Sequence, residues 1–145
     1  MLVHGSVTAM DQRISFITVA VADVAASRSF YVDGLGWTPE MEADGVLMIR
    51  VGEHVILSLW DRAEFEEEVG RIAVADGVAP FTLAHNVATR EEVDSVLELA
   101  RSLGRDASAA EERVWGGYTG YFADPDGVRW EIAYNPGPVG QTVLP

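Results

Sequence analysis

The chain has 145 residues and a formal net charge of −13, from 23 acidic and 10 basic residues. A chain of this length fits one compact domain, or two small halves that share a core. The acidic excess would repel a phosphate backbone and argues against nucleic acid as a partner. Cysteine is absent, which excludes a thiol nucleophile, an iron–sulfur cluster and a thiolate zinc site, and is compatible with a cytoplasmic location.

The first twelve residues, MLVHGSVTAMDQ, show no periodicity and are expected to form a flexible tail. They contain no basic segment followed by an apolar one, and nowhere in the chain do eighteen apolar residues follow one another. The sequence therefore predicts neither a signal peptide nor contact with a membrane.

An apolar, β-rich run over Ile14–Val21 opens the first half. Asp23 follows as an N-cap residue, and a helix is expected from there to Gly34. Three short strands separated by glycine-containing turns are predicted next, over residues 37–42, 45–51 and 54–60. The order in this half is β-α-β-β-β.

A more polar segment, residues 62–79, is expected to be a linker with a short helix over 63–70. The second half begins with a strand over Phe81–Val87. Thr89-Arg90-Glu91-Glu92 then matches the capping box of a helix that ends at Gly104. Three strands are predicted after it, near residues 107–113, 118–123 and 128–134.

The two halves therefore repeat one unit. Phe16–Gly36 and Thr82–Gly104 align without a gap through their strands when Asp23 is placed on Thr89. Such a repeat suggests a duplicated half-domain, whose two pseudo-symmetric sheets tend to enclose a cavity.

Distinctive motifs occur in both halves: Val21-Ala22-Asp23-Val24 with Ser27, Phe30-Tyr31 and Leu35-Gly36-Trp37 in the first, and Trp115-Gly116-Gly117-Tyr118, Asp124-Pro125-Asp126-Gly127 and Trp130-Glu131 in the second. With the repeat, they resemble the vicinal oxygen chelate superfamily, which contains glyoxalase I, extradiol dioxygenases and bleomycin- and fosfomycin-resistance proteins. The resemblance implies an α+β fold of two tandem βαβββ modules, with curled mixed sheets around a cavity and helices on the outer face. This scaffold hosts isomerases, lyases, oxygenases, transferases and plain binders, so it does not decide the chemistry.

The expected organisation is one glyoxalase-like domain over residues 13–136 with a tail at each end. Its parts are a tail over 1–12, module one over 13–61, a linker over 62–79, module two over 80–136 and a tail over 137–145. Regular structure is expected to end at Asn135-Pro136-Gly137-Pro138.

The resemblance also implies where metal-dependent members would carry their ligands. The matching positions are Phe16, Ser58, Thr82 and Glu131. Only Glu131 is a ligand type, whereas Mn, Fe, Ni and Zn favour several His or carboxylate donors. The sequence therefore predicts no metal and no cofactor.

The histidines are poor substitutes for the missing ligands. His85 lies three residues after Thr82, so a strand with a period of two turns it to the opposite face, toward the helices. It is expected to be a packed or hydrogen-bonded structural residue, with catalysis by its near-neutral imidazole as the alternative. His54 lies beside a turn and His4 in the tail.

Strand alternation predicts the cavity wall. If Ala123 pairs with Val128 across the Asp124–Gly127 turn, Tyr118 and Phe122 face the same way as Arg129 and Glu131. The predicted ligand-binding residues are Phe16, Ser58, Trp60, Thr82, Tyr118, Phe122, Arg129 and Glu131. These side chains could equally fill a core.

Glu131 is the one candidate catalytic residue. A carboxylate among apolar groups is costly unless it has a partner, a ligand or a raised pKa. Arg129, two positions away on the same face, is the expected structural partner. Otherwise Glu131 would serve as a general acid or base, or anchor a cationic ligand.

Three functions remain open at this point. The leading prediction is a metal-independent protein of the bleomycin-resistance kind that binds an aromatic or cationic small molecule between the modules. The alternatives are a metal-free enzyme that uses Glu131 as general acid or base, and a metal-dependent lyase, isomerase or dioxygenase in which His85 joins Glu131. The resemblance also implies a homodimer, because related proteins often share cavities between two chains.

Overall fold

The computed structural model describes residues 9–73 and 76–145. Its first module forms a four-stranded mixed sheet. Its elements are β1 (Phe16–Val21), α1 (Val24–Arg28), η1 (Ser29–Gly34), β2 (Pro39–Ala43), β3 (Val46–Gly52) and β4 (Val55–Asp61). The strand order is β1-β4-β3-β2; β1 is parallel to β4, and the other neighbours are antiparallel. We call this sheet A.

The second module repeats that arrangement. After α2 (Arg62–Glu68), its elements are β5 (Leu83–Val87), α3 (Arg90–Ser102), β6 (Glu111–Glu112), β7 (Tyr118–Ala123) and β8 (Arg129–Tyr134), and α4 (Pro138–Thr142) follows. The order in this sheet, sheet B, is β5-β8-β7-β6, with β5 parallel to β8. The predicted α+β fold of two tandem βαβββ modules is therefore confirmed.

Both main helices begin as the sequence predicts. The Asp23 carboxylate accepts a hydrogen bond from the Ala25 N–H at 2.9 Å, and the Thr89 hydroxyl accepts one from the Glu92 N–H at 3.2 Å. Each side chain thereby satisfies a backbone donor that has no partner within the first helical turn. In the first module the helix continues as the π-helical segment η1, which buries Phe30 and Tyr31.

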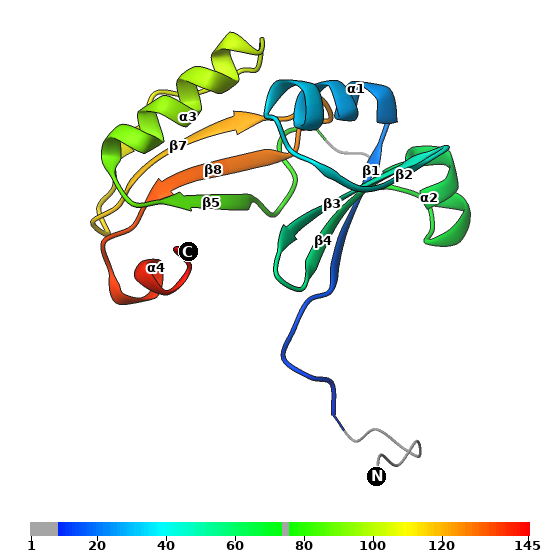
Figure 1. The fold of residues 1–145 in the computed structure, drawn as a ribbon, viewed down its shortest axis with the longest axis horizontal. Helices are drawn as coiled ribbons and strands as arrows, with labels where there is room; N and C mark the ends of the chain where they lie inside the picture. Colours follow the sequence, from blue (N-terminus) through cyan, green and yellow to red (C-terminus); the bar gives the residue numbers. More distant parts are fainter. Residues whose placement is uncertain (1–8, 74–75) are drawn as a thin grey trace.

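The helices cover one face of each sheet and leave much of the other uncovered. α1 and η1 lie on the same side of the molecule as α3 (Figure 1). α1 contacts β3 and β4, while α3 contacts β7 and β8 and buries Val93, Leu97 and Ala100. We call the opposite faces, which the helices leave largely uncovered, the open faces. A ligand can approach the sheets from this side.

The two modules share one hydrophobic core, which includes Phe30, Leu57, Leu97 and Trp130. Among the described residues, three hydrogen bonds connect the modules. The Tyr31 hydroxyl donates to Asp124 Oδ2 at 2.6 Å and accepts from Trp130 Nε1 at 3.0 Å, and the Ala22 N–H donates to Asp126 Oδ1 at 2.8 Å. The Asp124–Gly127 turn of module two is thus attached to the first module.

Two regions differ from the sequence-based expectation. The strand predicted near residues 107–113 is only Glu111–Glu112, because Ala107 forms a single bridge with Phe122 and the Ser108 side chain, not a backbone carbonyl, accepts the Tyr121 N–H. Regular structure also continues beyond Pro138. Pro138 occupies the first turn of α4, where a missing N–H costs nothing.

The predicted tail 1–12 and linker 62–79 lie partly outside the described residues. Within the linker, α2 confirms the predicted short helix. No helix in the described ranges is long and apolar enough to cross a bilayer.

Candidate functional site

The register between β7 and β8 decides which side chains reach the open face of sheet B. The expected pairing of Ala123 with Val128 is wrong by one residue, because Ala123 pairs with Arg129. The Asp124 carboxylate accepts the N–H groups of Asp126 and Val128, at 2.8 and 2.9 Å, and this holds Val128 in the loop. Tyr121 consequently lies opposite Glu131, and Phe122 lies opposite Trp130.

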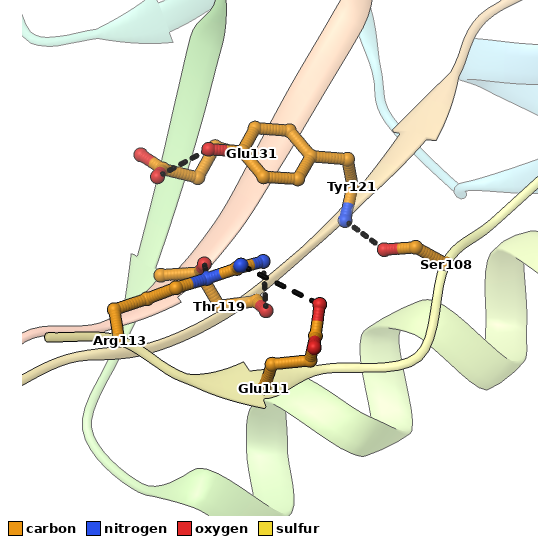
Figure 2. A network of polar contacts seen from close by, with 6 residues as sticks. All are labelled: Ser108, Glu111, Arg113, Thr119, Tyr121 and Glu131. Atoms are coloured by element: carbon orange, nitrogen blue, oxygen red, sulfur yellow. Dashed lines mark hydrogen bonds and ion pairs between the residues drawn. The ribbon is translucent and has the colours of Figure 1, made fainter.

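Glu131 has a hydrogen-bond partner that the sequence did not suggest. The Tyr121 hydroxyl donates to Glu131 Oε2 at 2.9 Å between neighbouring strands (Figure 2). Burial raises the pKa of the Tyr121 phenol above its ordinary 10.0, the hydrogen bond and the charge of Glu131 raise it further, and Arg113 opposes the rise. The pair places a carboxylate and a phenol side by side on a half-buried surface.

Arg113 is held in place beside this pair (Figure 2). Its Nε donates to Thr119 Oγ1 at 2.7 Å and its Nη2 to the Thr119 carbonyl oxygen at 3.2 Å. Nη1 also lies 3.4 Å from Glu111 Oε2. Because Thr119 is fully buried, its bonds hold the Arg113 side chain in one orientation. Most of the five Arg113 donors are already used in these contacts.

Arg129 lacks such partners. No acidic oxygen within the described residues lies within 4 Å of its guanidinium, so the expected ion pair with Glu131 does not form. Its Nε is shielded from solvent and forms no hydrogen bond within the same residues.

These groups surround a cavity of about 520 Å³ over sheet B. We call it the sheet B cavity. Its lining residues are Val78, Thr82, Asp106, Ala107, Ser108, Glu111, Arg113, Tyr121 and Arg129. Small-molecule pockets typically enclose about 300 to 1,000 Å³ and contain a few convergent polar groups, so the size and the chemistry both fit.

The structure brings together only part of the predicted site. Thr82 and Arg129 line the sheet B cavity, and Glu131 is joined to it through Tyr121. Phe16 (53% exposed) and the buried Ser58 belong to sheet A and are not among the residues that line the cavity.

Three predicted aromatic residues lie elsewhere. Tyr118 and Phe122 are on the helix side of sheet B, where the Tyr118 hydroxyl donates to Asp94 of α3 at 2.7 Å and the Phe122 ring stacks on Trp130. Trp60 Nε1 donates to Glu64 of α2 at 3.0 Å. Tyr121 is the one aromatic side chain among the described residues of the cavity wall, and the one-residue register shift is why the sequence missed it.

A larger cavity of about 700 Å³ lies between the modules. Thr82 is the one predicted residue on its wall, which contains core side chains such as Ile17, Leu57 and Trp130 and also the exposed Glu40 and Arg50. His85 also borders it. As expected from its parity, His85 pairs with Ile132 and faces away from Glu131, but it is exposed, so the expected packed histidine is wrong.

The donor set does not fit a catalytic metal. Among the four positions that match the ligands of metal-dependent relatives, Phe16, Ser58 and Thr82 provide no strong donor, and Glu131 is already bonded to Tyr121. Within the described ranges, no group of three or more His, Cys, Asp or Glu side chains could hold a metal ion.

The fold consists of two paired βαβββ modules, and charged and hydroxyl side chains line a cavity over one open sheet. These features define a class of small proteins that bind ligands or catalyse reactions. The model of the Glyoxalase/Bleomycin resistance protein/Dioxygenase superfamily matches residues 13–132, and the chain belongs to that family. No curated protein matches the sequence.

Solved structures resemble the chain over most of its length. A glyoxalase-related enzyme from Fulvimarina pelagi is 35% identical, with a TM-score of 0.76 and coverage of 86% of this chain and 89% of that one. A glyoxalase/bleomycin resistance protein/dioxygenase from Nocardioides is 27% identical, with a TM-score of 0.74 and coverage of 90% and 91%. A lactoylglutathione lyase from Agrobacterium tumefaciens, 20% identical with a TM-score of 0.65 and coverage of 86% and 94%, shares the fold.

Proposed function

We propose that the chain binds a small molecule in the sheet B cavity, and that it does so without a metal ion. The observation that carries this proposal is the convergence of Arg129, Thr82 and Tyr121 on one hollow of about 520 Å³, with Glu131 bonded to Tyr121. A filled core would not leave an arginine and a phenol around empty space. The Tyr121 ring supplies a surface for an aromatic ligand, and Glu131 supplies an attraction for a cationic group.

The proposal is tested by a thermal-shift screen of a library that holds aromatic, cationic, anionic and neutral molecules of fewer than about 25 heavy atoms. Binding that is weakened by Tyr121→Ala but kept by Tyr118→Ala supports it, because Tyr118 lies on the helix side of the same strand. Binding that survives Tyr121→Ala while His85→Ala abolishes it would move the site to the cavity between the modules.

A metal-free enzyme is the second candidate, and the bond between Tyr121 and Glu131 favours it. A half-buried carboxylate can act as a general base that takes a proton from a bound substrate, and the negative charge then passes to the substrate. In Glu131→Gln, loss of turnover with unchanged affinity would establish this function. Loss of affinity alone would leave Glu131 with a binding role.

We further propose a cytoplasmic homodimer in which a second copy completes the cavity. Phe16 is half exposed on the open face of sheet A, while Arg129 and Glu131 occupy the open face of sheet B. Light scattering of the purified chain gives its mass directly. A mass of 15.7 kDa at working concentration would exclude the dimer.

A further inference from the structure

We propose that the ligand of the sheet B cavity carries a carboxylate, which the guanidinium of Arg129 binds. This inference rests on the proposed function, namely that the cavity holds a small molecule, and it names the chemical class of that molecule. It also departs from a purely cationic ligand, which Arg129 would repel.

The first support comes from the ion pairs that the arginines of this chain form. All ten basic residues are arginines, and they are greatly outnumbered by 23 acids. Within the described residues, six of the ten form an ion pair with a carboxylate: Arg13, Arg28, Arg50, Arg90, Arg101 and Arg113. Arg129 is half-buried in a cavity wall, yet no carboxylate oxygen of the described residues lies within 4 Å of its guanidinium.

The second support is the state of the Arg129 side chain itself. A guanidinium has five N–H donors, and its Nε is here cut off from solvent without an acceptor. Leaving a charged donor buried and unpaired is costly, and a fork of two parallel N–H groups matches the two oxygens of a carboxylate. A ligand cannot reach the shielded Nε, but a carboxylate bound at the terminal Nη groups would give this partly buried guanidinium the counterion that it lacks within the described residues.

The surroundings favour a single negative charge. Asp106 and Glu111 also line the cavity, and Glu131 lies two residues from Arg129 on β8. A phosphate monoester, with about 1.5 to 2 negative charges, would be repelled by these three carboxylates more strongly than a monoanion. Thr82 directly precedes β5, whose first residue pairs with Trp130, and it lines the same cavity as Arg129, so it offers a hydroxyl donor to the same group.

The rest of the ligand is constrained by the opposite wall. Arg113 is locked to Thr119 and Glu111, so it adds a favourable potential without giving up its own bonds. Tyr121, a diagonal neighbour of Arg129 across the β7–β8 pairing, presents its ring to the cavity. A ligand that joins a carboxylate to a flat ring or a hydroxylated group could contact Arg129 with the first and Tyr121 with the second.

The test uses a library of small carboxylic acids in which every acid is paired with its primary amide and with the corresponding amine. Inorganic phosphate is screened beside them. Thermal-shift hits of the full chain are confirmed by calorimetry on the wild type, Arg129→Gln, Arg129→Lys and the control Arg62→Gln. Arg62 is an exposed arginine of α2 outside the cavity wall, so its substitution removes the same charge at another place.

We expect acids to bind the wild type and Arg62→Gln at least about tenfold more tightly than their amides. Arg129→Gln should weaken acid binding roughly ten- to a hundredfold and leave amide binding unchanged, since a charged hydrogen bond contributes that much. Arg129→Lys should fall between them because it keeps the charge but loses the fork. Far-UV circular dichroism confirms that each variant is folded.

Three outcomes overturn the inference. If amides or amines bind as well as acids, or if acid binding survives Arg129→Gln, the cavity binds small molecules but not through a carboxylate on Arg129. If inorganic phosphate binds more tightly than any acid, the anion is of another class. If no member of any charge binds, the proposed function fails together with the inference.

Discussion

The Tyr31 hydroxyl donates a hydrogen bond of 2.6 Å to Asp124 Oδ2, and it connects a helix of the first module to a turn of the second. Tyr31 is 1% exposed and Asp124 is 3% exposed, so the bond is made in the shared core. Burial and the Asp124 charge raise the pKa of the Tyr31 phenol far above its ordinary value, which keeps the hydroxyl protonated as a donor. The relative placement of the modules depends on this contact.

Tyr31→Phe should lower the free energy of unfolding by about 1–3 kcal/mol, because it leaves Asp124 Oδ2 and the Trp130 Nε1–H buried without a partner. Urea denaturation followed by tryptophan fluorescence measures the change. The matched control is Tyr118→Phe, which removes a hydroxyl that bonds Asp94 at the surface and should have a much smaller effect. Equal midpoints for the two variants would contradict the role of Tyr31.

Asp126 makes stability depend on pH in the same turn. Burial raises the pKa of its carboxyl above the ordinary 3.8, the Asp124 and Asp23 charges add to the rise, and the Ala22 N–H and Arg62 oppose it. Between the ordinary pKa of 3.8 and the raised pKa of the folded state, the folded chain binds more protons than the unfolded chain. The protonated Asp126 carboxyl therefore contributes fully to folding stability below pH 3.8, and this contribution is lost as pH rises through the raised pKa.

The stability of the wild type relative to Asp126→Asn should thus fall as pH increases through the window just above 3.8. Urea titrations of both proteins across this range measure the difference. A difference that stays constant with pH, or that grows as pH rises, would show that Asp126 is not destabilised by burial.

Gly120 lies where α3 packs against sheet B. A Cβ added there would clash with Leu97 Cδ1, and Leu97 is fully buried. Gly120→Ala should destabilise the fold by about 1–3 kcal/mol through overpacking. Gly52→Ala serves as the control, since its Cβ would meet Val55 at 3.6 Å, an ordinary contact. Similar thermal midpoints for both variants would show that α3 shifts freely.

The Tyr121 phenol reports on Glu131 in the candidate site. Glu131→Gln should move the pKa of Tyr121 toward 10.0, and the pKa should remain above that value because burial is the largest cause of the rise. Titration of ¹³C-labelled tyrosine by NMR follows each ring. The Tyr118 signal should not respond, because its hydroxyl bonds Asp94 on the other side of the sheet. An unchanged Tyr121 titration would mean that the two side chains are not bonded in solution.

Metal content tests the proposal that this chain works without a metal ion. Protein purified without chelator should contain far less than one equivalent of Mn, Fe, Ni or Zn, because one carboxylate with hydroxyl neighbours is a poor donor set. Elemental analysis measures this, and equilibrium dialysis against Zn²⁺ should show no tight site that Glu131→Gln removes. One equivalent of a transition metal bound through Glu131 would refute metal independence.

The amino-acid sequence by itself determined the order of strands and helix in each module and where each helix begins. The β-α-β-β-β order and the Asp23 and Thr89 caps are recognisable from periodicity and short motifs, because each depends on residues that are neighbours along the chain. The same alternation correctly turned His85 away from Glu131.

Only the tertiary structure decided what the candidate site contains. A change of one residue in the length of the Asp124–Val128 loop reverses every side chain of β7 relative to β8, and no local pattern specifies that length. The buried Asp124 carboxylate sets it by bonding Val128 and, from the other module, Tyr31. Asp124, which Tyr31 bonds from 93 residues away in sequence, thus belongs to the turn that sets Tyr121 opposite Glu131, while Arg129 Nε has no partner within the described residues.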